Sequence, residues 1–127
     1  MKILVCGSRD WTNVSIIRRE LSALYESLVG PMILIHGDCK GADTIAGAVG
    51  RQLGFEIRAY PAKWEEHGRA AGPIRNSQML LEEHPDKNGV MIDLVLAFHE
   101  NLEKSKGTKD MVLRAEKAGI KVVLVGE

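Results

Sequence analysis

Four short segments of this 127-residue chain combine glycine with charged or hydroxyl side chains, and chemistry is expected there first. They span residues 7–11, 36–43, 68–76 and 105–108. Glycine lets a backbone approach a ligand closely, and the planar guanidinium group of arginine pairs well with phosphate or carboxylate. The composition of these segments predicts a site for an anionic small molecule.

The last of these segments precedes a predicted helix. Gly107 and Thr108 would open that helix, so free N–H groups and the positive end of the helix dipole would face an anion. Hydroxyl and ammonium groups surround this point, from Ser105, Thr108, Lys104, Lys106 and Lys109. We interpret the segment as a phosphate site, and the alternative is a capped helix start with solvated lysines.

Three arginines in these segments, Arg9, Arg69 and Arg75, could supply ligand contacts, although a single arginine is more often part of a surface ion pair. Asn76, in the first turn of a predicted helix, could read the edge of a base or a ribose.

Aromatic and imidazole side chains in the same segments each have two interpretations. Trp11 and Trp64 could stack on a base or fill the core beneath the loops. His36 and His99 could act as acid–base groups, but single histidines at strand ends are more often structural.

Two carboxylates are candidate catalytic groups for cleavage of a glycosidic bond. Asp43 could accept hydrogen bonds from ribose hydroxyls or hold Arg9, and its structural alternative is to cap the following helix. Glu100 follows a predicted strand on the side where the other motifs gather, whereas Asp93 precedes that strand and lies at the wrong end.

Standard cofactor motifs are absent from the sequence. Gly37 and Gly41 do not have P-loop spacing, and no G-x-G-x-x-G follows the first apolar run. Cys6, His36 and Cys39 could lie near one another, but a zinc site usually needs four ligands at tighter spacing. We therefore expect no metal and no cofactor.

Five short apolar runs, at residues 3–6, 32–35, 55–60, 94–98 and 122–125, alternate with amphipathic stretches. Thr12 or Asn13 could cap a first helix whose inner face carries Val14, Ile17, Leu21, Leu24 and Leu28. Three further helices are predicted: one capped by Asp43 and ended by Gly54, one from Pro73 to about His84, and one from Thr108 to Gly119.

Strand–helix alternation of this kind predicts right-handed crossovers and a parallel sheet with helices on both faces. All four polar segments then lie beyond the carboxyl ends of the strands, where open α/β sheets bind ligands at the reversal of strand order. We expect an α/β three-layer sandwich with five parallel strands in the order 3-2-1-4-5.

Length and charge limit the classes of function. The chain has the size of one domain, and its 17 Lys and Arg balance its 17 Asp and Glu. A neutral chain with 5% aromatic residues is a poor candidate for coating nucleic acid or a membrane. The apolar runs are too short for a membrane span or a signal peptide, and two cysteines make no disulfide framework. We expect a cytoplasmic protein, and a homo-oligomer stays open.

Taken together, the segments GSRDW, HGDCKGAD, AGPIRNSQM, LVLAFH and SKGT resemble the YspA/YpsA-related branch of the SLOG superfamily. This resemblance implies a Rossmann-like domain that binds nucleotides or nucleotide-derived molecules, of a kind frequent in phages and mobile elements. More distant relatives are the LOG-type phosphoribohydrolases and the DNA-processing protein DprA. By resemblance the pocket would be lined by Gly7, Ser8, Arg9, Gly37, Gly41, Asp43, Arg75, Asn76, Gly107 and Thr108.

The chain departs from the LOG-type signature PGGxGTxxE. Its Gly107-Thr108 matches, but Met111 stands where the catalytic glutamate would be, and Asp110 would point about 100° away around the helix. The leading prediction is therefore a sensor or sequestering module that binds a nucleotide derivative. The alternatives are a nucleotide N-glycosidase and a single-stranded DNA-binding protein.

Overall fold

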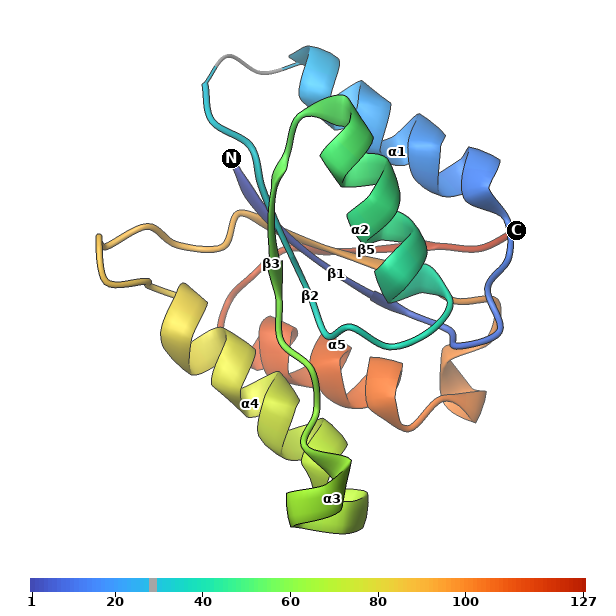
Figure 1. The fold of residues 1–127 in the computed structure, drawn as a ribbon, viewed down its shortest axis with the longest axis vertical. Helices are drawn as coiled ribbons and strands as arrows, with labels where there is room; N and C mark the ends of the chain where they lie inside the picture. The colour runs from blue at the N-terminus through green and yellow to red at the C-terminus, as the bar shows by residue number, and fades with distance from the viewer. Residues whose placement is uncertain (28–29) are drawn as a thin grey trace.

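The computed structural model describes residues 1–27 and 30–127 (Figure 1). The elements are β1 (Lys2–Gly7), α1 (Val14–Ser27), β2 (Ile33–His36), α2 (Ala42–Leu53), β3 (Glu56–Ala59), α3 (Trp64–His67), α4 (Ala71–Glu83), β4 (Leu94–Phe98), α5 (Gly107–Lys117) and β5 (Val122–Val125). Two 3₁₀ turns, Gly68–Ala70 and Leu102–Lys104, precede α4 and α5. Leu28, predicted on the inner face of the first helix, lies outside the described residues.

The five strands form one parallel sheet in the order β3-β2-β1-β4-β5, which confirms the predicted topology. The register pairs Val5 with His36 on one side of β1 and with Leu96 on the other. The order reverses at β1, because β2 and β4 flank it. The connections that leave the ends of β1 and β4 therefore diverge to opposite faces and leave a crevice between them.

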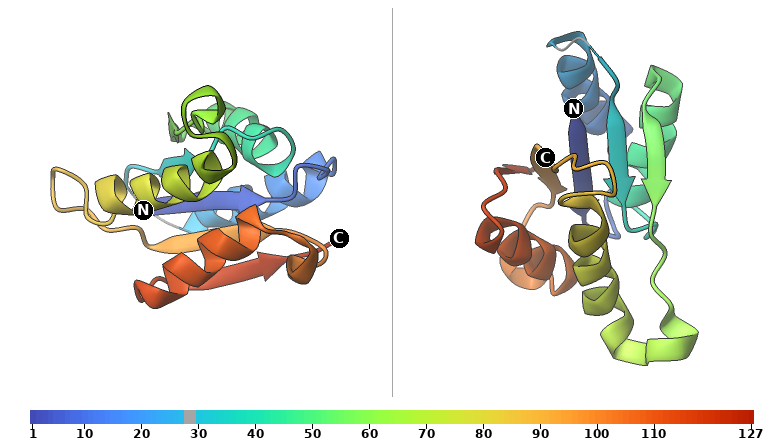
Figure 2. Two further views of the ribbon diagram at one scale, coloured as in Figure 1. Left: turned by 90° about the horizontal axis from the view of Figure 1, so that it is seen from below. Right: turned by 90° about the vertical axis from the view of Figure 1, so that its left-hand side faces the viewer.

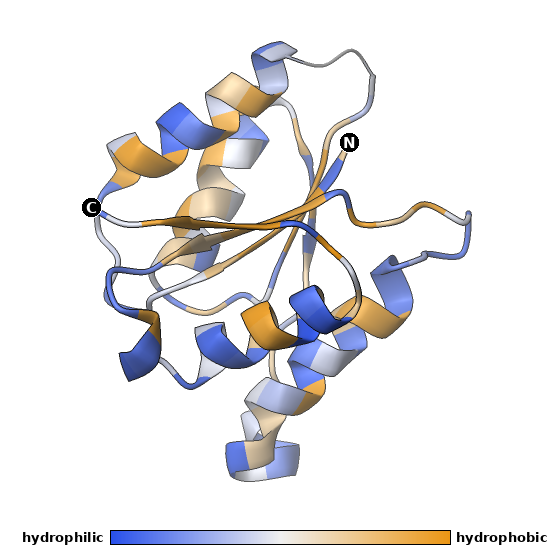
Figure 3. Cartoon of the chain, turned by 180° about the vertical axis from the view of Figure 1, so that it is seen from behind, coloured by the Kyte–Doolittle hydropathy of each residue, from blue (hydrophilic) through white to orange (hydrophobic). Residues whose placement is uncertain are grey.

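Helices α1 and α2 cover one face of the sheet, and α4 and α5 cover the other (Figure 2). Successive residues of a strand point to opposite faces, so Ile3 and Val5 pack under α1 and α2 while Leu4 and Cys6 pack under α4 and α5. The central strands are consequently mostly apolar, and polar residues lie on the outward sides of the helices (Figure 3).

The helix boundaries confirm some predicted caps and correct others. Asn13 caps α1, because its Oδ1 accepts a hydrogen bond from the amide of Ile16 at 3.1 Å. Asp43 does not cap α2: the helix starts at Ala42 after Gly41, and the Asp43 carboxylate turns back toward the preceding loop. The third predicted helix starts two residues earlier than Pro73, at Ala71. Proline is tolerated there because first-turn amides have no partner within the helix.

The connection from β3 to α4 and the connection from β4 to α5 both contain short helical turns. Residues 64–70 form α3 and a 3₁₀ turn, and these lie at the far end of the molecule beyond α4 (Figure 1). A four-residue helix shows too little periodicity to be predicted from an amphipathic pattern. None of the described helices is both long and apolar enough to cross a membrane.

Candidate functional site

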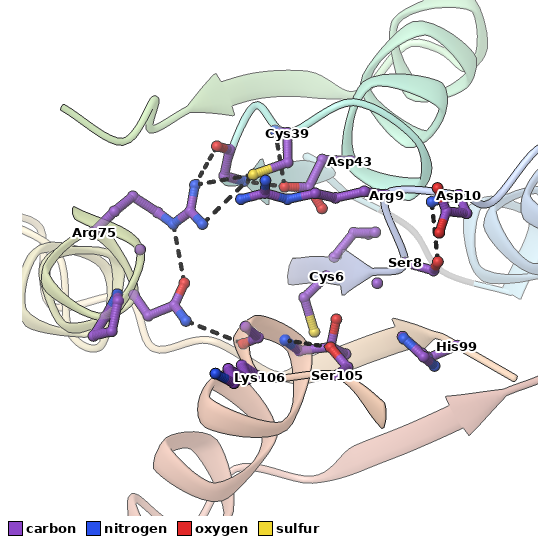
Figure 4. Close-up of a pocket in the computed structure, with 18 of the residues that line it drawn as sticks. Cys6, Ser8, Arg9, Asp10, Cys39, Asp43, Arg75, His99, Ser105 and Lys106 are labelled. Carbon is purple, nitrogen blue, oxygen red and sulfur yellow. Dashed lines mark hydrogen bonds between the residues drawn. The ribbon is translucent and has the colours of Figure 1, made fainter. Parts of the chain in front are cut away.

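A cavity of about 450 Å³ opens at the carboxyl edge of the sheet, where the connections after β1 and β4 separate. Its walls come from the segments that follow β1, β2, β3 and β4, and Figure 4 shows the side chains converging from these segments. Of the predicted site residues, those lining the cavity are Gly7, Ser8, Arg9, Gly37, Asp43, Arg69, Arg75, Asn76, Ser105, Gly107 and Thr108. Four parts of the fold thus meet at one cavity.

Positive charge exceeds negative charge at this cavity, although the whole chain is neutral. Five lysines and arginines line it against two aspartates: Arg9, Arg69, Arg75, Lys104 and Lys106 against Asp10 and Asp43. Arg9, Arg69, Lys104 and Lys106 form no ion pair within the part of the chain that is described. An anionic ligand would find cations here that are not already neutralised.

Two glycines bring the loops of this edge into contact. A Cβ at Gly7 would lie 2.4 Å from the carbonyl oxygen of Phe98 and 2.7 Å from the Cβ of Ala42. Gly41 has a φ of +90°, and a Cβ there would lie 2.4 Å from the carbonyl oxygen of Ser8. Gly41 does not line the cavity, so its role in this structure is to seat the loop after β2 against the loop after β1.

The start of α5 has unused hydrogen-bond donors. The Ser105 hydroxyl accepts from the amide of Thr108 at 3.1 Å, which is an ordinary N-terminal cap. The amides of Lys106 and Gly107 have no acceptor among the described residues. A Cβ at Gly107 would meet nothing within 4 Å, so the space over this amide is open. The capped helix and the phosphate site were predicted as alternatives, and this geometry is compatible with both together.

Arg75 reaches from α4 toward the loop after β2 and lies almost fully buried, with 7% of its surface exposed. Its Nε donates to Asn76 Oδ1 at 3.0 Å, and Nη1 donates to the carbonyl oxygens of Gly37 and Tyr60. Both terminal nitrogens contact Cys39 Sγ at 3.7 Å. Most of the guanidinium group is therefore committed to holding the loop, and Nη2 keeps the weakest partner.

Asn76 joins α4 to the start of α5. Its amide nitrogen donates to the carbonyl oxygen of Gly107 at 3.3 Å and to Asp110 Oδ2 at 3.0 Å. Asn76 therefore fixes the position of the open amides on α5 as well as lining the cavity.

Asp43 is a buried carboxylate on the wall of the cavity. Its Oδ2 accepts from the amides of Gly37 at 3.1 Å and Cys39 at 3.2 Å. Its other oxygen accepts no hydrogen bond from a described residue. Burial raises the pKa of Asp43 to about 6, and the two amides and Arg75 oppose that rise.

Three further predicted site residues lie outside the cavity lining. Trp11 is in the core, edge-to-face with Phe98 at 5.6 Å, so its core alternative is the correct one. His36 is buried, accepts from the amide of Asp38 at 2.9 Å, and has its pKa lowered chiefly by burial. Glu100 is exposed, and its carboxylate raises the pKa of the neighbouring Glu127. Each side chain comes from the predicted edge but turns away from the cavity.

The floor of the cavity was not in the predicted set. Val5, Cys6 and Met79 form it, and burial keeps the Cys6 thiol protonated by raising its pKa. These residues belong to apolar runs, so nothing in their spacing distinguishes them from other core residues. The candidates Trp64, His99, Lys104 and Lys106 line the cavity as well. Cys39 and Asp10 also line it although neither was predicted to bind a ligand, and their position after strand ends was the available signal. Among the described residues, no group of three His, Cys, Asp or Glu is placed to hold a metal ion.

Comparison with known proteins agrees with this fold and with the motifs at the sheet edge. The model of the YspA, cpYpsA-related SLOG family matches residues 1–67, which include β1, β2, β3 and the polar segments after β1 and β2. The chain is 36% identical over 132 residues to the Gene 61 protein of Mycobacterium phage D29, and the match covers 99% of this chain and 97% of that relative. Because the family model matches more than half of its residues, the chain belongs to the YspA, cpYpsA-related SLOG family.

Proposed function

We propose that the protein binds a nucleotide or a nucleotide-derived small molecule in the cavity at the carboxyl edge of the sheet. One observation carries this proposal. In a chain without net charge, lysines and arginines that form no ion pair among the described residues gather around the open amides of α5. They lie where the order of the strands reverses. Membership of the SLOG family favours a nucleotide over other anions.

In this proposal the phosphate lies against the start of α5. The amides of Lys106 and Gly107 donate to its oxygens, and the side chains of Lys104 and Lys106 neutralise its charge. Arg69, from the 3₁₀ turn before α4, faces the same cavity and adds a guanidinium fork.

We favour binding, as a sensor or a sequestering module, over hydrolysis of LOG type. Met111, at the position of the LOG-type glutamate, is fully buried and packs beneath the sheet. The neighbouring carboxylate, Asp110, pairs with Arg114 at 2.8 Å and accepts from Asn76. Neither residue presents a free carboxylate to the cavity.

A second candidate function is hydrolysis of a nucleotide N-glycosidic bond by Asp43, and one observation favours it. Two backbone amides fix one carboxylate oxygen while the other has no described partner, and the pKa of about 6 suits proton transfer near neutral pH. Above that pH the free oxygen would accept a proton from an attacking water.

A thermal shift assay with nucleoside mono-, di- and triphosphates tests the proposal, with chromatography of the same mixtures for released base. A raised melting temperature without free base supports binding, and released base that disappears in Asp43→Asn supports the hydrolase. The absence of both with every nucleotide would overturn the proposal.

Two controls sharpen this assay. The double variant Lys104→Ala/Lys106→Ala should lose the shift, whereas Lys117→Ala/Lys121→Ala, which removes equal charge from exposed positions outside the cavity, should keep it. A single-stranded oligonucleotide that competes with the nucleotide and binds more tightly would favour the DNA-binding alternative instead.

A further inference from the structure

A second cavity of about 280 Å³ adjoins the first and shares four lining residues with it: Arg9, Gly37, Cys39 and Trp64. Its remaining walls come from the loop after β2 and from the chain that leads into α3, through Asp38, Lys40, Pro61 and Ala62. Arg9 and Trp64 therefore stand at the junction of two cavities, one of which contains the open amides of α5.

Trp64 is exposed to an unusual degree for an indole side chain, with 45% of its surface accessible. It is the first residue of α3, and its ring rests over the start of α4, where a Cβ at Gly72 would lie 3.5 Å from Cη2. The ring is thus supported by the backbone of α4 and still keeps nearly half of its surface exposed. Trp11, by contrast, is 4% exposed and donates its indole N–H to the carbonyl oxygen of Asn13.

Arg9 lies over the indole ring, with its guanidinium carbon 5.2 Å from the ring centroid. It makes no hydrogen bond or ion pair with any residue in the described ranges, so the cation–π contact is its one protein interaction of note. An exposed arginine stacked on an exposed tryptophan presents a flat surface beside a cation. Asp38 and Lys40, on the rim of the second cavity, add an acceptor and a donor without partners of their own among the described side chains.

We propose that Trp64 and Arg9 form the base-binding part of the site, and that the ligand class is a nucleoside phosphate whose base lies in the second cavity against the indole ring. This inference rests on the proposed function, because it assumes that the phosphate lies at α5. The planar face of a base can stack on the Trp64 ring, and the hydrogen-bonding groups on the edge of the base can pair with Asp38 and Lys40. Arg9 lies between base and phosphate, where it can contact either.

The test compares ligands with and without a base. Affinities for the four ribonucleoside 5′-monophosphates and for ribose 5-phosphate are measured by calorimetry on the unaltered protein, Trp64→Ala and Trp64→Phe. Trp64→Ala should weaken nucleotide binding roughly 5- to 150-fold, which corresponds to the 1–3 kcal/mol lost when an aromatic that stacks on a base is truncated. It should leave ribose 5-phosphate unchanged, and Trp64→Phe should recover most of the loss because it keeps an aromatic face.

Tyr25→Ala is the matched control, because Tyr25 is exposed to 43% on α1 and lines neither cavity. It should leave all affinities unchanged. Quenching of indole fluorescence by nucleotides, but not by ribose 5-phosphate, gives a second readout, since Trp11 is buried in the core.

The outcomes separate the two proposals. Equal affinity of Trp64→Ala and the unaltered protein for nucleotides, or an equal loss for nucleotides and ribose 5-phosphate, would overturn the role of Trp64 and leave the cavity a phosphate site. Failure of the unaltered protein to bind these ligands and the di- and triphosphates of the thermal shift assay would overturn the proposed function, and the base-binding role with it.

Discussion

The two ends of α4 each carry a concentration of charged groups, but they use the charge differently. At the amino-terminal end lies the cavity, and four of its five cations form no ion pair with the residues that the structure describes. At the carboxyl-terminal end lies a second group, the Lys2 cluster, made of Lys2, Arg58, Tyr60, Glu83 and Asp86. Lys2 is fully buried, and its ammonium group donates to Glu83 Oε1 at 3.0 Å and to Asp86 Oδ2 at 2.7 Å.

The Lys2 cluster leaves none of its charged members without an opposite charge. Glu83 also accepts from Arg58 at 2.7 Å and from Tyr60 at 2.5 Å, and Lys2 donates further to the carbonyl oxygens of Glu83 and Val90. A buried charge that is fully paired fixes structure, whereas removal of one partner is strongly destabilising. The contrast suggests that charge matched within the protein has a structural role, and that unmatched charge at the cavity is available to a ligand.

Of the substitutions considered, replacement of Lys2 at the centre of the Lys2 cluster should lower the free energy of unfolding most. Lys2→Met leaves the buried Glu83 without its ammonium partner, so we expect the free energy of unfolding in urea to fall by about 3–5 kcal/mol. Lys117→Met, at an exposed position on α5, is the control and should change it by less than about 0.5 kcal/mol. A Lys2→Met protein as stable as Lys117→Met would show that the cluster is dispensable.

Arg75→Lys tests whether a cavity residue can also be structural. Lysine keeps the charge but cannot reach Gly37, Tyr60 and Asn76 at once, so we expect a loss of about 2–3 kcal/mol in the free energy of unfolding. The same exchange at Arg69, which is exposed and has no ion pair among the described residues, should leave stability unchanged. If Arg75→Lys lowered nucleotide affinity with an unchanged melting temperature, Arg75 would be a ligand clamp instead.

Asp43→Asn should stabilise the protein. Asparagine can still accept from the amides of Gly37 and Cys39, and it removes a charge whose burial is unfavourable. We expect up to about 3 kcal/mol more stability above pH 6, because that free energy corresponds to a pKa raised from 3.8 to about 6. Urea titrations of both proteins at pH 7 measure this directly, and a destabilised variant would contradict it.

The pH dependence of the two regions should have opposite signs. The folded protein binds the Asp43 proton more tightly than the unfolded chain, so this site loses stability as pH rises from about 4 to about 6. Burial raises the pKa of Glu83, but hydrogen bonds from Tyr60, Lys2 and Arg58 outweigh it and bring that pKa below its ordinary value. The hydrogen bond from Lys2 likewise lowers the pKa of Asp86. The Lys2 cluster therefore loses stability as pH falls below about 4.5. Unfolding curves of Lys2→Met and Asp43→Asn across this range should separate the two contributions.

The smallest effect on folding is expected at the start of α5. Gly107→Ala meets no atom within 4 Å, so stability should stay level or rise by up to about 1 kcal/mol through helix propensity, while the added methyl group weakens anion binding. Thr108→Pro removes the amide that Ser105 caps, so it should lower the melting temperature as well as affinity. Calorimetry with a nucleotide and a melting curve on each variant would distinguish these outcomes, and unchanged affinity in Gly107→Ala would place the phosphate elsewhere.

The order of the strands could be predicted because five β-rich runs alternate with helical patterns and each polar segment follows a run. The side on which Arg9, Asp43 and Thr108 lie follows from that order alone. The directions of Trp11, His36 and Glu100 could not be predicted, because a side chain near a strand end turns inward or outward according to its tertiary neighbours. The Lys2 cluster was also not predicted, since Lys2 and Glu83 are 81 residues apart and neither has a local pattern that marks its partner.

The short helix that carries Trp64 has a further consequence for how fast a ligand can enter and leave. Neither α3 nor the 3₁₀ turn after it has a buried residue, whereas β1 is buried along almost its whole length. Segments with so little buried surface open at low free energy without disturbing the core. Amide hydrogens of residues 64–70 should therefore exchange with solvent far sooner than those of β1. Association and release can then proceed by local opening of this segment, at rates set independently of the global stability of the sheet.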